Sequence, residues 1–179
     1  MINLVPRVRI ELRPSRIDKG GVGVFAVCDF EKGDKVCDGI SDEDFQELVS
    51  WELFERYEAD LRRMIMAFCV GAPKGFVPPP DFDFNKLSIE WYLNHSCEGN
   101  CGFNDDGDFM AIRDIPKGEE LSYDYGLVES NPRFSMRCTC GSGSCRHLIT
   151  GNDWKNENFF LKNQGHMHPR LRRLLPVTA

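Results

Sequence analysis

Three cysteines toward the C-terminal end of the chain are spaced for metal binding. Cys138, Cys140 and Cys145 follow the pattern C-x-C-x4-C in a loop of glycine and serine that could hardly pack a core. Such a loop can wrap three thiolates around one tetrahedral zinc ion. A closed structural site needs a fourth ligand, and Cys97 and Cys101 are the upstream candidates. The spacing predicts a zinc site, with a chance group of free thiols as the alternative.

A glycine-rich turn could bring a ligand close to the backbone. Residues 21–26 read Gly-Val-Gly-Val-Phe-Ala, which fits the dinucleotide fingerprint G-x-G-x-x-A. The residues that follow favour a strand where that fingerprint requires a helix. What remains is a turn whose glycines, without Cβ atoms, allow a ligand to approach closely. Taken alone, the motif is better explained as an ordinary turn before a strand.

Two tyrosines could place their hydroxyl groups in one pocket. Tyr123 and Tyr125 lie two residues apart in a segment that favours a strand, so their side chains share one face. Taken alone, a pair of aromatic core residues is the better explanation.

These groups lie among short elements. Apolar and alternating runs predict strands at residues 8–12, 23–28, 35–37, 100–104, 109–112 and 120–124. A helix is predicted directly after Ser41, which Asp44 would cap. A second helical period spans residues 61–68. Residues 71–83, with three consecutive prolines, are predicted to form a loop. Short strands around one helical insert, without a βαβ alternation, indicate an α+β domain that is mainly β.

Composition narrows the classes of protein and partner. The 179 residues carry a net charge of -6 and eight cysteines. The longest apolar run, residues 64–70, is far too short for a membrane span, and the N-terminal segment has no signal-peptide core. We therefore expect an intracellular, reducing location and no membrane contact. The acidic body argues against direct nucleic-acid binding, even with a basic C-terminal segment.

The acidic charge is concentrated in one stretch. Residues 41–60 contain eight acids and one base, a local net charge of -7. Such a stretch could attract a cationic partner, whereas the simpler alternative is a solvated helix face.

Together with Asn-His-Ser-Cys at residues 94–97, these motifs resemble the SET-domain protein lysine methyltransferases that carry a cysteine-rich post-SET segment. The resemblance runs from about residue 19 to residue 146. The chain departs from the family pattern at four points: Gly99 replaces a proline, Trp91-Tyr92 replaces Arg-Phe, His147 replaces a glycine, and no cysteine-rich pre-SET block precedes residue 19.

The resemblance implies a fold of small β-sheets around a pseudoknot. It places a flanking strand at residues 1–18, a SET domain at 19–127 with an acidic helical insert at about 41–86, a post-SET zinc segment at 128–150, and a C-terminal tail at 151–179. Within this tail, residues 166–176 could dock as a short helix through Leu171, Leu174 and Leu175, or stay disordered until substrate binds.

The resemblance also implies residue roles. Tyr125 would be the catalytic tyrosine, and Tyr123 would occupy the tyrosine/phenylalanine switch position, which implies mainly mono-methylation. Cys97 would complete the zinc site, in place of Cys101. The groups expected to bind S-adenosylmethionine are Gly21, Val22, Gly23, Asn94 and His95. Phe134 or Trp154 would cover its adenine ring.

The implied activity is methylation of a lysine in a basic protein or peptide, such as a histone tail. The enzyme would act in the nucleus of a eukaryote or the cytoplasm of a bacterium. The alternative is a catalytically silent SET module that binds proteins and is stabilised by zinc. Retention of Tyr125, Asn94 and His95 argues against a silent module, and the sequence leaves the oligomeric state open.

Overall fold

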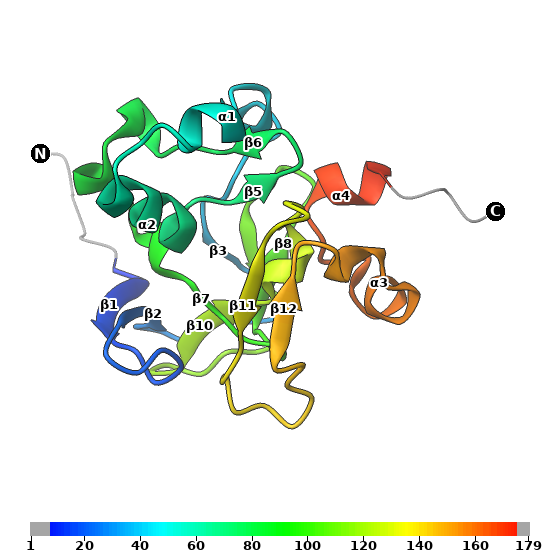
Figure 1. Cartoon of the computed structure of the whole chain (residues 1–179). Coiled ribbons are helices and arrows are strands. Elements are labelled where there is room, and N and C mark those ends of the chain that lie inside the picture. The colour runs from blue at the N-terminus through cyan, green and yellow to red at the C-terminus, as the bar shows by residue number, and fades with distance from the viewer. Residues whose placement is uncertain (1–7, 175–179) are drawn as a thin grey trace, which may run out of the picture.

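A seven-stranded sheet forms the centre of the computed structural model, which describes residues 8–174 (Figure 1). Its strands run in the order β1-β2-β10-β8-β9-β3, and β7 pairs with β10 off this path. The strands are β1 (Ile10–Pro14), β2 (Val22–Ala26), β3 (Lys35–Cys37), β7 (Asn94–His95), β8 (Cys101–Phe103), β9 (Phe109–Ala111) and β10 (Glu120–Tyr123). The predicted strands are confirmed, with ends displaced by at most two residues.

The middle of this sheet is apolar. Val24 and Leu121 are fully buried and pair across β2 and β10. Burial on both faces explains why β2 reads as a continuous apolar run, whereas β1, at the sheet edge, alternates. The motifs at the ends of β2 and β10 are therefore held on a rigid support.

Two strands run parallel to a strand that comes later in the chain. β7 and β8 both pair in parallel with β10, and the amide of Ser96 donates to the carbonyl of Tyr123 at 3.0 Å. The amide of Tyr125, just beyond β10, donates back to the ring of His95. This crossing of the 94–101 segment with the chain after β10 is the threading expected of the pseudoknot.

The insert packs on one side of the sheet. It holds β4 (Val49–Ser50), α1 (Trp51–Phe54), α2 (Ala59–Phe68), β5 (Gly71–Ala72) and β6 (Gly75–Phe76), and its strands form a sheet in the order β4-β6-β5. The predicted helix at 61–68 is confirmed in α2. The predicted loop at 71–83 was partly wrong, because it contains the β5–β6 hairpin.

The helix predicted directly after Ser41 is not formed. Ser41 and Asp44 exchange the reciprocal hydrogen bonds of a capping box, but only a 3-10 turn (Asp44–Gln46) comes after them. Phe45 in this turn contacts His168 near the C-terminal end of the described chain. The predicted capping box is confirmed, whereas the predicted helix was wrong. The contact with His168 holds the segment as a 3-10 turn instead. The other 3-10 turns are Pro80–Phe82, Phe84–Lys86, Ile89–Tyr92, Tyr125–Leu127 and Asp153–Lys155.

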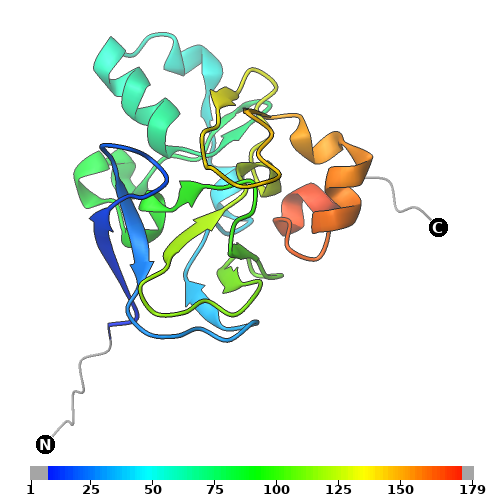
Figure 2. The same cartoon turned by 90° about the horizontal axis from the view of Figure 1, so that it is seen from below.

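The C-terminal part returns to the sheet. β11 (Ser135–Arg137) and β12 (Leu148–Thr150) form a hairpin, followed by α3 (Glu157–Asn163) and α4 (Pro169–Leu174) (Figure 2). The amide of His168 donates to the carbonyl of Leu127 at 2.9 Å, and Leu171 is fully buried. Docking as a short helix is therefore the outcome for this segment. Leu174 is exposed, and Leu175 lies outside the described residues.

Within residues 8–174, no helix combines the length and the apolar character needed to cross a membrane.

Candidate active site and metal centre

The β11–β12 hairpin brings four thiols together. The Sγ atoms of Cys97, Cys138, Cys140 and Cys145 all lie within 4.8 Å of one another. The Sγ of Cys138 is 3.8 Å from that of Cys97 and 3.7 Å from that of Cys145. Four sulfurs at about 2.3 Å from a tetrahedral zinc ion are separated by about 3.8 Å, so this donor set fits zinc.

Cys101 takes no part in the cluster. It is fully buried in β8, and its Sγ lies 3.4 Å from the Oδ1 of Asn100. Of the two upstream candidates that the sequence offered, the structure brings Cys97 to the cluster and leaves Cys101 in the sheet.

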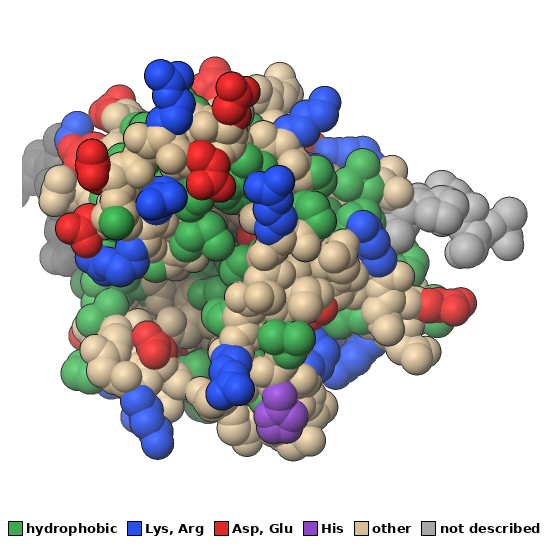
Figure 3. Space-filling view, viewed as in Figure 1, with side chains coloured by type: hydrophobic (Ala, Val, Ile, Leu, Met, Phe, Trp, Pro, Cys, Tyr) green, Lys and Arg blue, Asp and Glu red, His purple; other side chains and the backbone are tan. Residues whose placement is uncertain are grey.

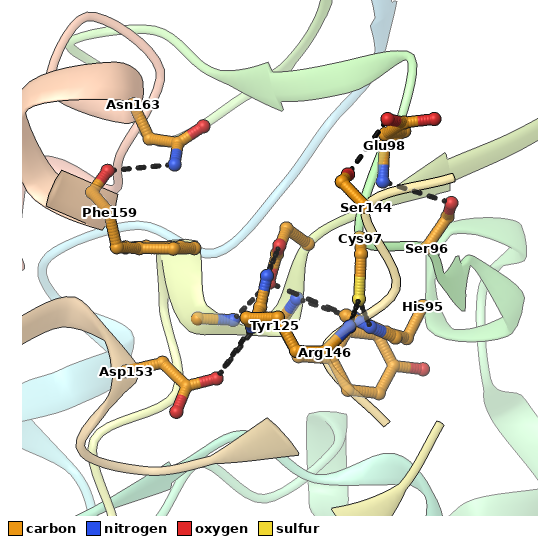
Figure 4. Close-up of polar contacts among 12 residues, drawn as sticks. His95, Ser96, Cys97, Glu98, Tyr125, Ser144, Arg146, Asp153, Phe159 and Asn163 are labelled. Carbon is orange, nitrogen blue, oxygen red and sulfur yellow. Dashed lines mark hydrogen bonds and ion pairs between the residues drawn. The ribbon is translucent and has the colours of Figure 1, made fainter. Parts of the chain in front are cut away.

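His95 connects the cysteine cluster to the tyrosine pair (Figure 4). Its Nε2 lies 3.4 Å from the Sγ of Cys97, and its Nδ1 accepts a hydrogen bond from the amide of Tyr125 at 3.1 Å. Burial lowers the pKa of His95 to about 4, so the ring is neutral and can accept this bond. The side chain is fully engaged, which leaves only the backbone of His95 for a cofactor.

Arg146 joins the cysteine loop to the chain after β10. Its Nη2 donates to the Oδ1 of Asp124 at 2.7 Å and lies 3.0 Å from the Oδ2 of Asp153, while its amide points to the Sγ of Cys97 at 3.4 Å. A bidentate arginine–carboxylate pair gives strong and directional contact. The sequence interpretation missed this pair, because nothing local indicates that residues 22 positions apart meet.

Tyr123 and Tyr125 lie side by side. Their ring centroids are 5.0 Å apart, and the hydroxyl of Tyr125 donates to the carbonyl of Leu93 at 3.2 Å. Burial raises the pKa of both phenols, and the charge of Asp18 raises that of Tyr125 further. Both hydroxyls therefore keep their protons at neutral pH.

The two tyrosines line a cavity of about 590 Å³, which we call the tyrosine cavity. Among the described residues that line it, none is a lysine or an arginine. Figure 3 shows the surface hollowed between the insert and the β11–β12 hairpin. The carboxylates that line the tyrosine cavity are Glu43, Asp44, Glu47, Asp81, Glu90 and Glu129.

Only part of the acidic stretch reaches this cavity. Three of the eight acids in residues 41–60 line it, and the cavity gains three carboxylates from elsewhere in the chain. Asp42 pairs with Arg173, and Arg62 pairs with Glu55. Figure 3 accordingly shows basic side chains mixed with the acidic ones over the insert.

The groups expected to bind S-adenosylmethionine are brought together. The Nδ2 of Asn94 donates to the carbonyl of Val22 at 2.9 Å and lies 3.1 Å from both Ser15 Oγ and Glu120 Oε1. The glycine-rich turn and the Asn-His segment, about 70 residues apart in sequence, therefore form one unit.

The two glycines lie against carboxylates of the protein itself. A Cβ at Gly23 would lie 2.2 Å from Oε1 of Glu120, and a Cβ at Gly21 would lie 2.3 Å from Oδ2 of Asp18. The space beside both glycines is thus occupied by carboxylates of the protein itself.

Glu120 is the residue on which this unit is centred, and the sequence interpretation missed it. The side chain is buried and accepts hydrogen bonds from the hydroxyl of Ser15 and the amide of Arg16, both at 2.7 Å. The only local signal is an acid at the start of an otherwise buried strand, which cannot be distinguished by pattern from an exposed edge residue.

The two aromatic residues expected to cover adenine lie in different environments. Trp154 is buried in the core, and its Nε1 donates to the carbonyl of Gly151 at 3.0 Å. Phe134 lines the tyrosine cavity.

Comparisons with known proteins agree with this geometry. A family model described as SET domain matches residues 21–126. The chain is 34% identical over 155 residues to Histone-lysine N-methyltransferase TRX1 of Oryza sativa subsp. japonica, covering 80% of this chain and 14% of that protein. It is 30% identical over 93 residues to Histone-lysine N-methyltransferase ASHH2 of Arabidopsis thaliana, covering 48% of this chain and 5% of that protein.

Among solved structures, a humanized mutant of the Chaetomium thermophilum Polycomb Repressive Complex 2 bound to the inhibitor GSK126 aligns at 26% identity with a TM-score of 0.46. The alignment covers 68% of this chain and 15% of that one. The chain thus spans only a small part of these proteins.

The match at 21–126 covers more than half of the chain and includes both tyrosines, the glycine-rich turn, and residues 94–97. The chain therefore belongs to the SET-domain family, and its C-terminal cysteine cluster fits a post-SET zinc segment.

Proposed function

We propose that this protein transfers a methyl group from S-adenosylmethionine to a lysine side chain of a basic protein or peptide, such as a histone tail. The observation that carries the proposal is the tyrosine cavity, which is lined by two protonated tyrosines and six acidic side chains. Several relatives are named histone-lysine N-methyltransferases, which supports the reaction class.

The cavity suits a lysine side chain. Its carboxylates attract the ammonium group, and the aromatic rings around Tyr123 accept the aliphatic stem. An amine must be deprotonated before it attacks, and free lysine has a pKa of about 10.4. Burial of the amine beside these rings lowers that pKa by removing water from the ammonium group.

Tyr125 orients the amine in this proposal. Its hydroxyl already donates to the carbonyl of Leu93, and its pKa is raised, so it is a poor base at neutral pH. An oxygen with a remaining lone pair can accept a hydrogen bond from the amine and direct the nitrogen lone pair toward the donor. Orientation of this kind lowers the barrier without a change in protonation.

The cofactor would lie along the glycine-rich turn and the Asn-His segment, which hydrogen bonds join. When bound, S-adenosylmethionine supplies an electrophilic methyl group on a sulfonium. The backbone of Gly21, Val22 and Gly23 would hold its methionine end. The Oδ1 of Asn94 and the backbone of His95 would contact the adenosine, because Asn94 Nδ2 and the His95 ring have partners within the protein.

Tyr123 would limit the product to mono-methylation. Its ring lies 4.9 Å from that of Phe109 and 5.0 Å from that of Tyr125, so it is held on two sides. A hydroxyl in that position takes up the volume that a second methyl group on the nitrogen would need.

Labelled S-adenosylmethionine with basic peptides tests the proposal. We expect methyl transfer by the wild type and a loss of at least about 100-fold in kcat for Tyr125→Phe, with zinc content and cofactor affinity unchanged. Tyr123→Phe is expected to raise the share of di-methylated product, and Tyr92→Phe, outside the cavity lining, is the matched control. No incorporation by a wild-type protein that binds both zinc and cofactor would favour the silent module instead.

A further inference from the structure

The C-terminal helix α4 contacts two walls of the tyrosine cavity. One wall is residues 39–47, which we call the acid wall, and it contributes Glu43, Asp44 and Glu47 to the lining. The other is formed by Val128 and Glu129, directly after the tyrosine turn. The two walls are about 85 residues apart in the chain, and α4 is an element that contacts both of them.

His168, just before α4, holds the acid wall. Its side chain is fully buried, its Nδ1 accepts the amide of Arg170 at 3.2 Å, and its Nε2 lies 2.7 Å from the carbonyl of Ile40. Since Nδ1 accepts, the proton is on Nε2, which donates to Ile40. The imidazole also packs edge-on against Phe45 and Phe103, each at 5.2 Å between ring centroids.

Arg170 contacts both walls with one side chain. Its guanidinium carbon lies 4.0 Å from the ring centroid of Phe45 in the acid wall. Its Nη2 donates to the carbonyl of Val128 at 3.0 Å and to the hydroxyl of Ser130 at 2.9 Å. Arg173, three residues on, pairs with Asp42.

The acid wall has little support of its own. It contains one 3-10 turn and no α-helix, and Glu43, Asp44 and Glu47 are exposed. Segments with few internal hydrogen bonds open with low free energy unless another element holds them. From outside the wall, Gly107 packs against the backbone of Gly39 and Ile40, and the side chains of His168, Arg170 and Arg173 supply the polar and cation–π contacts.

We propose that α4 is a positioning element that sets the spacing between the acid wall and the Val128 wall, and thereby the affinity for the substrate peptide. Arg170 and His168 are positioning residues, because they act through Phe45, Ile40 and Val128. The kinetic part of this inference rests on the proposed function, whereas the structural part does not.

Hydrogen exchange of residues 39–47, measured by mass spectrometry on the full chain, is the structural readout. In Arg170→Gln we expect exchange about tenfold faster in this segment and unchanged exchange in β1 and β2, because a charged hydrogen bond and a cation–π contact are lost together. Peptide KM should rise about tenfold, with kcat, zinc content and cofactor affinity unchanged.

Arg172→Gln is the matched control on the same helix. Arg172 pairs with Asp105, which does not line the cavity, so exchange in residues 39–47 and peptide KM should stay at wild-type values. Arg173→Gln removes one ion pair with an exposed arginine and should give a change of about twofold. If Arg170→Gln loses protection throughout the molecule, Arg170→Lys, which keeps the charge and loses the fork, serves in its place.

Three results would overturn the inference. One is unchanged exchange of the acid wall in a folded Arg170 variant, and another is equal acceleration in Arg172→Gln. The third is a looser acid wall with an unchanged peptide KM. If the wild type transfers no methyl group, the proposed function fails, and the exchange comparison alone then decides whether α4 holds the wall.

Discussion

At the scale of single residues, buried carboxylates decide where small residues are required. Gly21 and Gly23 look equivalent in the glycine-rich turn, yet their neighbours differ. Glu120, beside Gly23, is buried and held by Ser15 and Arg16, whereas Asp18, beside Gly21, is exposed. A side chain that is held cannot yield to a new methyl group, while an exposed one can.

Gly23→Ala should therefore be far more damaging than Gly21→Ala. The Cβ at residue 23 displaces Glu120 from the hydrogen bonds that join the turn to Asn94, so we expect about 2 kcal/mol of destabilisation and at least about tenfold weaker cofactor binding. Gly21→Ala should change either quantity little. Urea denaturation and calorimetric titration measure both.

Gly165→Ala is the control for an added methyl group, since no atom lies within 4 Å of its Cβ position. Equal effects of the substitutions at residues 21 and 23 would contradict the role assigned to Glu120.

At the scale of elements, the β11–β12 hairpin matters because it carries ligands to a distant segment. Cys138, Cys140 and Cys145 belong to this hairpin, and Cys97 belongs to the chain between β7 and β8. His95 then links Cys97 to the amide of Tyr125. A metal ion bound at the hairpin would thereby be coupled to the geometry of the tyrosine pair.

Loss of zinc should weaken cofactor binding. In Cys97→Ser we expect zinc content to fall well below one ion per chain and cofactor affinity to drop about tenfold or more, because the hairpin and His95 lose their common anchor. Cys101→Ser changes the other cysteine of the same segment and should keep its zinc. Wild-type cofactor affinity in a zinc-free Cys97 variant would contradict this coupling.

The acid wall is the second element with a specific expectation. Replacing Glu43, Asp44 and Glu47 by their amides should raise the KM for a basic peptide about tenfold at low salt, with a smaller effect at high salt, because screening weakens such attraction. The triple amide variant at Glu52, Glu58 and Asp60 removes the same charge from residues outside the cavity lining. Equal effects of the two triple variants would show that only net charge matters.

At the scale of the whole molecule, Glu129 links the insert to the core. Its carboxylate accepts hydrogen bonds from the amide of Gly71 in β5 at 2.7 Å and from the amide of Asn131 at 2.6 Å. Burial raises the pKa of Glu129 to about 7. The two amides and the charge of Arg170 lower this pKa, but by less than burial raises it. Between pH 4.5 and about 7, Glu129 is therefore protonated in the folded state and ionised in the unfolded chain.

This difference predicts a pH dependence of stability. Between pH 4.5 and 7 the folded state binds more protons, so the contribution of Glu129 to the free energy of unfolding falls as pH rises, by about 3 kcal/mol in total. Glu129→Gln should lack this fall, which urea denaturation from pH 4.5 to 8 measures. Glu43→Gln, an exposed acid of the same cavity, is the control. Parallel pH profiles for wild type and Glu129→Gln would contradict the prediction.

The sequence alone determined what is local in this protein. The spacing of Cys138, Cys140 and Cys145 lies within one loop, and the strand patterns of β2 and β10 reflect their own burial. The motifs in series sufficed to indicate the family and the tyrosine pair. These features were predictable because each depends on neighbours within a few residues.

Only the tertiary structure decided which distant groups meet. Glu120 occupies the space beside Gly23, Arg146 pairs with Asp124, and three acids rather than eight line the cavity from the 41–60 stretch. The segment after Ser41 forms no α-helix because Phe45 packs on His168, more than 120 residues away. Contacts between distant segments depend on how the chain crosses itself, which no local pattern encodes.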